Sequence, residues 1–200
     1  RYIKSPDPFE WLQGFQELKD VIQEASGDRS DADFLHVGCG SSLLPEDMYD
    51  FGYRKIVNID NSGVCIRQMA ERNVARPGLK WLEMDATNMS LPDESFDVVI
   101  DKSVLDTFAC GDSATKVIGK YLGEVQRVLR PRGVFLCISY GLPGTRTEYF
   151  ETDKLNFSCK QVPIPPKDKE GSTHYVYVLQ KRVDSDAEIM AAEAAAAQSS

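Results

Sequence analysis

Continuous apolar runs alternate with segments of helical periodicity along most of this chain. The strand-like runs are DFLHV at 33–37, RKIVNI at 54–59, LKWLEM at 79–84, FDVVI at 96–100 and VFLCIS at 134–139. Several are apolar throughout rather than at every second position, which is typical of strands covered on both faces. The pattern therefore predicts a sheet that is buried on both sides.

Three further segments carry apolar residues at helical spacing. The first helix is predicted after Pro6 and Pro8, and the second after Ser62, a candidate N-cap. The third is predicted to stop before Pro131 and Gly133. Their expected buried faces are Phe15, Leu18 and Ile22, then Ile66, Met69, Ala70 and Val74, and finally Tyr121, Leu122, Val125, Val128 and Leu129. Helices alternating with strands predict a doubly wound α/β fold with a parallel sheet and right-handed crossovers.

The end of the chain departs from this alternation. Two strand-like runs at 155–164 and 173–182 are joined by a loop rich in Pro, Lys and Gly, with no helix between them. We expect them to form an antiparallel hairpin at the edge of the sheet. Residues 1–182 are thus predicted to be one domain, and the Ala-rich segment 183–200, which has no apolar stripe to dock, a frayed helix or disordered tail.

Composition and charge narrow the possible functions. Two hundred residues with 42% hydrophobic content suit one domain with an enzyme-sized core. A formal net charge of -8 argues against nucleic acid as a partner and favours a partner with a basic surface. The five cysteines, at 39, 65, 110, 137 and 159, include no C-x-x-C pair, so we expect reduced thiols, no metal site and a cytoplasmic protein.

The ends and the hydropathy of the chain give two further expectations. No stretch approaches the roughly 18 apolar residues of a membrane span, so no membrane association is predicted. The chain begins at Arg1 rather than Met, so we expect upstream residues that could complete an N-terminal element.

A glycine-rich turn, Gly38-Cys39-Gly40, directly follows the first strand-like run. In open α/β sheets the crevice beyond the carboxyl ends of the strands binds ligands, and glycines there let the backbone approach a ligand closely. A purely structural turn would explain the same residues. The dinucleotide pattern G-x-G-x-x-G fails because Leu43 occupies the third glycine position, and a phosphate loop fails because G-K-[ST] is absent.

Two acidic residues end the next two strand-like runs. Asp60 stands about 20 residues beyond the glycines, where a carboxylate can accept both ribose hydroxyls of an adenosine. A solvated carboxylate that caps the following helix is the alternative. Asp85 ends the third run, and there its side chain and the N–H of Ala86 can bind the edge of an adenine. A dinucleotide fold needs no acid at this position, so the combination favours another adenosyl cofactor.

These sites, together with the closing hairpin, resemble the class I S-adenosylmethionine-dependent methyltransferases over roughly residues 9–182. The resemblance implies a Rossmann-like sheet of seven strands in the order 3-2-1-4-5-7-6, with strand 7 antiparallel. DKSVLDTF at 101–108, EVQRVLRPRGVFL and DPFEWL are similar to the methyltransferase-like 13 group, which includes lysine methyltransferases of elongation factor 1-alpha. That group usually has Gly-Thr where Ser103 and Val104 stand here, and many class I enzymes have an acid where His36 stands.

The resemblance also implies a role for each site residue. Tyr2 and Trp11 would close the cofactor pocket, although Trp11 could equally belong to the core. Gly38, Cys39 and Gly40 would face the methionine part of S-adenosylmethionine, Asp60 and Asn61 the ribose, and Asp85 and Ala86 the adenine. Lys102 and the backbone of Asp101 would lie beside the methionine carboxylate and the transferring methyl.

The expected function is therefore methyl transfer from S-adenosylmethionine, with S-adenosylhomocysteine as product, to a lysine of a basic protein. Asp101 and Asp106 are the candidate acids at the mouth of the site that would attract the lysine ammonium, with no dedicated general base, and Asp106 could instead cap a helix. A small-molecule methyltransferase, a non-catalytic cofactor-binding subunit and a nicotinamide oxidoreductase are the alternatives.

Overall fold

The computed structural model describes residues 9–111, 113–165 and 173–183 of the chain. Tyr2, most of the Ala-rich tail and most of the loop between the last two strand-like runs lie outside these described residues. The predictions made for them are therefore not tested.

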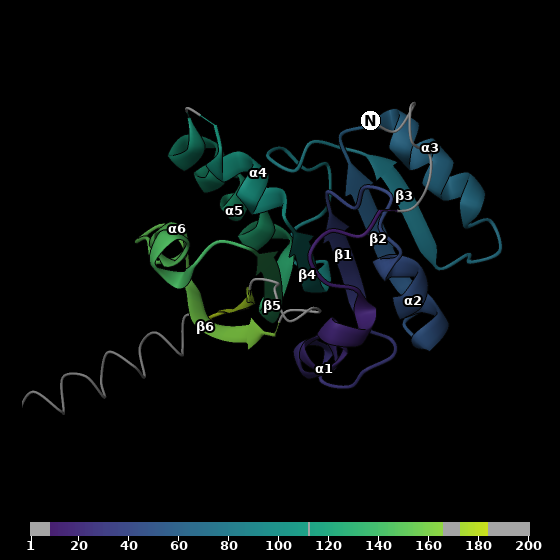
Figure 1. The fold of residues 1–200 in the computed structure, drawn as a ribbon, viewed down its shortest axis with the longest axis horizontal. Coiled ribbons are helices and arrows are strands. Elements are labelled where there is room, and N and C mark those ends of the chain that lie inside the picture. Colours follow the sequence, from purple (N-terminus) through teal and green to yellow (C-terminus); the bar gives the residue numbers. More distant parts are fainter. Residues whose placement is uncertain (1–8, 112, 166–172, 184–200) are drawn as a thin grey trace, which may run out of the picture.

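The described residues form one seven-stranded sheet in the order β3-β2-β1-β4-β5-β7-β6 (Figure 1). β1 to β5 are parallel, and β7 runs antiparallel to both β5 and β6. The predicted sheet order and edge hairpin are confirmed. The strands are β1 (Asp33–Val37), β2 (Lys55–Asp60), β3 (Leu79–Glu83), β4 (Phe96–Lys102), β5 (Leu129–Ser139), β6 (Phe157–Ile164) and β7 (His174–Lys181).

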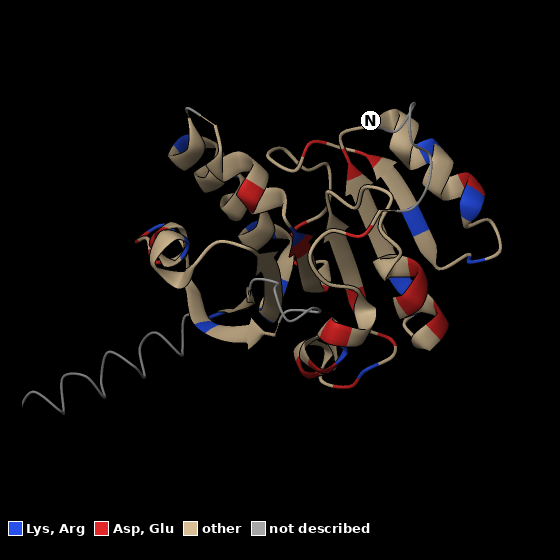
Figure 2. Ribbon diagram, in the orientation of Figure 1, with Lys and Arg blue, Asp and Glu red and all other residues tan. Residues whose placement is uncertain are grey.

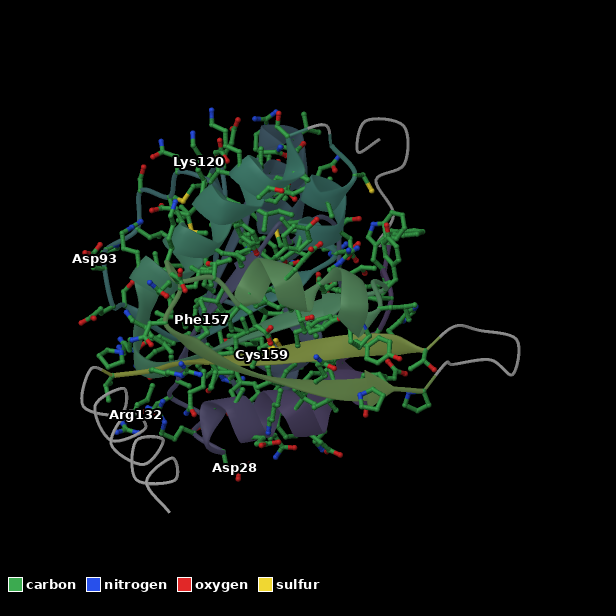
Figure 3. The ribbon with its side chains drawn as sticks, turned by 90° about the vertical axis from the view of Figure 1, so that its left-hand side faces the viewer. Asp28, Asp93, Lys120, Arg132, Phe157 and Cys159 are labelled. Carbon is green, nitrogen blue, oxygen red and sulfur yellow. The ribbon has the colours of Figure 1, made fainter. Side chains whose placement is uncertain are left out.

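Helices cover both faces of this sheet. They are α1 (Phe15–Ser26), α2 (Leu44–Phe51), α3 (Gly63–Arg72), α4 (Val104–Ala109), α5 (Ala114–Val128) and α6 (Thr147–Phe150), with a 3₁₀ turn η1 (Pro143–Thr145). Figure 3 views the molecule from the β6 edge and shows β6 and β7 between α1 on one side and the helices that follow β4 and β5 on the other. The fold is thus the predicted three-layer α/β arrangement.

Successive residues of each strand point to opposite faces, which splits the core in two. Phe34, Val98 and Ile100 pack with α1 and α2, whereas Leu35 and Val99 pack with α4 and α5. This alternation decides which way each residue at a strand end faces, and it therefore determines the composition of the site.

The first predicted helix is confirmed, because all three residues of its expected face are buried in α1. The predicted face of α3 is partly wrong. Ile66 and Met69 are buried and Ser62 caps the helix, but Ala70 is exposed and Val74 lies beyond the helix end with 85% of its surface exposed. The helix ends at Arg72, and its C-cap residue Asn73 donates its side-chain N–H to the carbonyl of Met69.

The boundary between α5 and β5 also differs from the prediction. α5 ends at Val128, and Leu129 is extended and pairs with Phe96 as the first residue of β5. Leu129 is still buried in the same apolar cluster as the helix. The apolar pattern therefore identified a core residue correctly but assigned it to the wrong element.

Candidate active site

A cavity of about 530 Å³ lies across the carboxyl ends of the parallel strands. Its lining includes residues that follow β1, β2, β3, β4 and β5, and it brings together the three predicted strand ends at Gly38, Asp60 and Asp85. Figure 2 shows acidic residues at the ends of β2 and β3, on this edge of the sheet. The arrangement has the geometry of a ligand site in an open α/β sheet.

The glycine turn after β1 forms one wall of this cavity. Gly38 and Gly40 both have positive φ, 56° and 51°, which favours glycine. A Cβ on Gly38 would lie 2.2 Å from Cγ2 of Val104, so the turn and the start of α4 touch at this point. Cys39 is buried between the glycines and its N–H donates to the carbonyl of Ile59 at 3.0 Å. Glycine at 38 is therefore required by packing, whatever the cavity binds.

The carboxylate of Asp60 joins the ends of β1 and β2. Its Oδ2 accepts a hydrogen bond from the N–H of Gly40 at 2.9 Å, and its Oδ1 accepts one from the N–H of Ser62 at 2.9 Å. Asp60 is buried, and the side chain of Ser62 caps α3, so the alternative of a solvated, helix-capping Asp60 is wrong. Each carboxylate oxygen has a second lone pair, so Asp60 can still accept hydrogen bonds from a ligand.

Asn61, Asp85 and Ala86 lie further along the same cavity, towards β3. Asp85 is exposed, and its Oδ1 accepts hydrogen bonds from the N–H and the hydroxyl of Thr87 at 2.8 and 2.9 Å. These contacts shape the loop after β3. The two residues of the predicted adenine-binding pair, Asp85 and Ala86, thus line one cavity.

Lys102 lines the cavity, but its ammonium group is engaged within the protein. Its Nζ forms an ion pair with Glu10 and donates hydrogen bonds to Ser42 Oγ at 3.1 Å and to the carbonyl of Gln13 at 3.3 Å. Glu10 also accepts from the Ser42 hydroxyl at 2.8 Å. Lys102 therefore ties the N-terminal segment to the ends of β1 and β4 and is not a solvated side chain.

Asp101 points to the opposite face of the sheet, because it precedes Lys102 in the same strand. It is fully buried and accepts hydrogen bonds from Val104 N at 2.7 Å, Leu105 N at 3.0 Å and the Tyr121 hydroxyl at 2.8 Å. Burial raises the pKa of Asp101 to about 7, an effect that these hydrogen bonds oppose. The prediction of an acid at the mouth is wrong for Asp101, whose carboxylate instead fixes the start of α4.

Asp106 lines the cavity, yet its carboxylate is almost fully buried. Oδ1 accepts from Arg146 Nε and Nη2 at 3.1 and 3.0 Å and from the Ser139 hydroxyl, and Oδ2 accepts from Tyr140 N at 3.2 Å and Ser103 Oγ at 3.4 Å. Asp106 makes no helix cap. Its predicted role of attracting an ammonium is also contradicted, because both of its oxygens are occupied by donors from the chain.

His36 is also a buried titratable residue that lines the cavity. Burial lowers its pKa to about 4, with Asn58 opposing the shift, so the ring is neutral near pH 7. Within the described residues Nδ1 has no hydrogen-bond partner. A neutral ring with an unused nitrogen thus lies where the sequence departs from the acid of many class I enzymes.

Aromatic residues line the cavity on two sides. Trp11 lines it with 52% of its surface exposed and packs edge-to-face on Phe9, so the alternative of a core Trp11 is wrong. Phe108 and Tyr140 lie on the side of β4 and β5. Sequence reasoning missed Phe9, Phe108 and Tyr140 as site residues. Tyr140 could have been predicted, because it directly follows the parallel strand β5, much as Asp85 follows β3 after one intervening residue.

Two kinds of site are not found among the described residues. No group of three or more His, Cys, Asp or Glu side chains is placed to hold a metal ion. Within the same ranges, no helix combines the length and the apolar character needed to cross a membrane.

The comparisons with known proteins agree with this geometry. A family model described as "Methyltransferase domain" matches residues 35–137, which is the region that carries the strand ends of the cavity. The chain belongs to this methyltransferase family, and its sheet order is that of the class I enzymes. Family membership disfavours the nicotinamide oxidoreductase.

Two curated relatives narrow the likeness. The chain is 45% identical over 134 residues to "eEF1A lysine and N-terminal methyltransferase" of Bos taurus, a match that covers 66% of this chain but only 19% of that relative. It is 28% identical over 191 residues to "EEF1A lysine methyltransferase 4" of Bos taurus, covering 90% of this chain and 72% of that relative. The chain thus spans about a fifth of the first relative's length.

Solved structures share the fold. The N-methyltransferase NodS from Bradyrhizobium japonicum WM9, solved in complex with S-adenosyl-L-homocysteine, has a TM-score of 0.66 and 14% sequence identity, covering 83% of this chain and 86% of that one. A methyltransferase structure from Methanosarcina mazei has a TM-score of 0.64 and 19% identity, covering 82% and 98% respectively. At these identities the likeness shows the fold alone.

Proposed function

We propose that this protein transfers methyl groups from S-adenosylmethionine to a lysine of a protein substrate. The observation that carries the proposal is the single cavity into which Gly38, Asp60 and Asp85 converge from three neighbouring strand ends. Family membership supports the class of reaction, and the names of the relatives support the acceptor.

The residues of the cavity fit this cofactor. In the order of the strands from β3 to β1, the adenine would lie at Asp85 and Ala86, the ribose at Asp60 and Asn61, and the methionine part at the glycine turn. Asp60 has lone pairs left for ribose hydroxyls, and the absent Cβ at Gly40 lets main chain line the cavity. When bound, the cofactor supplies a methyl group activated by a positively charged sulfur.

The contribution of the chain is then mainly alignment and exclusion of water. Positioning two reactants can lower a barrier by up to about 7–11 kcal/mol. A lysine must lose its proton before it can attack, and burial in a partly apolar cavity lowers the pKa of an amine. Asp101 is fully buried and does not line the cavity, and Asp106 is saturated with hydrogen bonds from the chain, so we assign neither as a general base.

The segment after β5 supports a protein acceptor. In the described residues, 141–154 form only η1 and α6, without a further layer over the cavity. Residues 141–154 thus form no lid, which suits an acceptor side chain presented by a protein. The net charge of -8 is suited to a basic partner, because charge complementarity accelerates encounter.

The test has two parts. Calorimetric titration with S-adenosylhomocysteine should show binding well below millimolar, and NAD should bind far more weakly. Incubation of the protein with labelled S-adenosylmethionine and purified eEF1A should then label a lysine, located by mass spectrometry. Binding of cofactor without label in eEF1A or in any protein of a cell lysate would favour the non-catalytic subunit, and label in small metabolites would favour the small-molecule enzyme.

A further inference from the structure

The cavity extends beyond the strand ends that the cofactor would occupy. From β3 to β1 it carries the adenosine-binding and methionine-binding residues, and it then continues past β4 to β5. Its lining in this last part is Ser103, Val104, Asp106, Thr107, Phe108, Cys110 and Tyr140. Because the sheet order separates β5 from β3 by three strands, this end of the cavity is left for the acceptor.

Tyr140 is held in place at this end by its main chain. Its N–H donates to Asp106 Oδ2 at 3.2 Å, and Asp106 is itself fixed by Ser139 and Arg146. Tyr140 nevertheless has 50% of its surface exposed, although burying an aromatic side chain would stabilise the fold. The buried ion pair between Asp106 and Arg146 thus holds the exposed ring of Tyr140 at the wall of the cavity.

The charged groups around Tyr140 are already paired. Arg146 binds Asp106 and lies 5.9 Å from the centre of the Tyr140 ring, and Gly141 leaves room for it, because a Cβ there would come 2.3 Å from Arg146 Nε. The Tyr140 hydroxyl lies 3.8 Å from Cys110 Sγ, a contact that raises the pKa of Tyr140, so the phenol stays neutral. Among the described residues that line it, this end of the cavity therefore offers an amine an aromatic ring and a hydroxyl rather than a free carboxylate.

We propose that Tyr140 contacts the acceptor nitrogen and that the acceptor is an alkylamine. The ammonium would first release a proton to water, and the neutral nitrogen would then form the bond to the methyl carbon with its lone pair. The carbon–sulfur bond would break with its electron pair on sulfur, which gives S-adenosylhomocysteine and a methylated ammonium. This rests on the proposed methyl transfer to a lysine and deepens it. A ring face attracts a methylated ammonium through the cation–π interaction, and it does not hold the unreactive protonated amine as tightly as a carboxylate would. Asp106 and Arg146 act through Tyr140, as positioning residues.

The first test measures binding without any protein substrate. The protein, saturated with S-adenosylhomocysteine, is titrated with n-butyltrimethylammonium and followed by NMR. Wild type should bind it saturably, Tyr140→Phe should bind within about 2-fold of wild type, and Tyr140→Leu should bind at least about 5-fold more weakly. Phe51→Leu, which removes an exposed ring outside the cavity, is the matched control and should leave binding unchanged.

The second test follows the transfer of label from S-adenosylmethionine to purified eEF1A. Tyr140→Leu should lower kcat/KM for the protein substrate and shift the products towards fewer methyl groups per lysine. The affinity for S-adenosylhomocysteine should stay unchanged. A merely structural role for Tyr140 would not shift the product distribution while leaving that affinity intact. If wild type binds the ammonium but labels no protein, the proposed protein acceptor fails and the inference stands. If wild type does not bind the ammonium, or Tyr140→Leu binds it equally well, the inference is overturned.

Discussion

Asp60 Oδ2 accepts a hydrogen bond from the N–H of Gly40 at 2.9 Å, so the end of β2 holds the glycine turn that comes after β1. The same carboxylate accepts a second hydrogen bond from Ser62 at the start of α3. One side chain thus sets the relative position of two walls of the cavity. The proposed cofactor binding and the local structure therefore involve the same two oxygens.

Asp60→Asn should weaken binding of S-adenosylhomocysteine by about 10-fold or more. The amide has one oxygen and cannot accept from both N–H groups, and hydrogen bonds to a charged group contribute about 1.5–3 kcal/mol. Calorimetry measures the effect. Asp93→Asn, at an exposed carboxylate outside the cavity, is the control. Unchanged affinity in a folded Asp60→Asn protein would remove Asp60 from the cofactor site.

Gly38→Ala should destabilise the protein more than Gly27→Ala does. Both glycines have nearly the same φ, 56° and 61°, so the free-energy cost of a Cβ in the left-handed region is the same at both positions. Only at Gly38 does the added methyl meet a neighbour, Val104, and overpacking costs about 1–3 kcal/mol. Urea denaturation should show this difference, and adding Val104→Ala to Gly38→Ala should recover part of it. Equal losses at the two glycines would refute the contact.

Ser103→Gly should stabilise the protein by roughly 0.5–1 kcal/mol. Ser103 has a φ of 74°, in the left-handed region, which costs a residue with a Cβ about 1–2 kcal/mol, and glycine loses about 0.5–1 kcal/mol of this gain through its greater unfolded entropy. The structure thereby explains why the similar methyltransferase group has Gly here. Thermal denaturation measures the change, and a lower Tm for Ser103→Gly would contradict the expected strain.

The ion pair between Glu10 and Lys102 should be energetically coupled. Lys102 is almost fully buried, so removing either partner leaves a poorly solvated charge. A double-mutant cycle with Glu10→Gln and Lys102→Met should give a coupling of about 1–3 kcal/mol in urea denaturation. The exposed pair Lys160–Glu24 is the control and should give at most about 1 kcal/mol. Equal coupling in the two pairs would mean that Lys102 does not anchor the N-terminal segment.

His36 should make stability depend on pH. Its pKa is about 4 in the folded chain and 6.5 when unfolded, so between these values only the unfolded chain binds the proton. The free energy of unfolding that His36 contributes therefore falls as the pH falls through this window. Asp101, whose pKa is raised to about 7, acts in the opposite direction, because the folded chain retains a proton there.

Comparison of wild type with His36→Gln isolates the histidine, since Asp101 is common to both. The stability difference, wild type minus variant, should be constant above about pH 7.5 and should fall between about pH 6.5 and pH 4. Urea denaturation across this range measures it. A difference that does not change with pH would mean that His36 titrates normally and is not buried as described.

The strand ends were predictable from the sequence because parallel strands place their carboxyl ends at one edge. The side chains of Asp101 and Lys102 were harder to assign, since neighbouring residues of β4 face opposite layers and the sequence does not say which layer holds the cavity. α2 was not predicted, because an eight-residue helix that begins at Leu44-Pro45 shows too few turns for a clear period.

Contacts between distant side chains were also beyond sequence reasoning. From the sequence Asp106 could either meet a substrate or cap a helix, and only the fold brings Arg146 to it from the segment after β5. Arg146 is 40 residues away from Asp106 in the chain, so the spacing of the two residues in the sequence does not reveal that they pair.

The contact between Gly38 and Val104 limits how the acceptor preference of this methyltransferase can evolve. A bulkier residue at 104 would push on the glycine turn, so it would disturb the place where we propose that the methyl donor binds. Valine has nearly the same shape as the threonine of the similar group, which preserves the fit. A change of acceptor preference is therefore easier at Thr107, which is exposed and lines the same cavity, than at Val104.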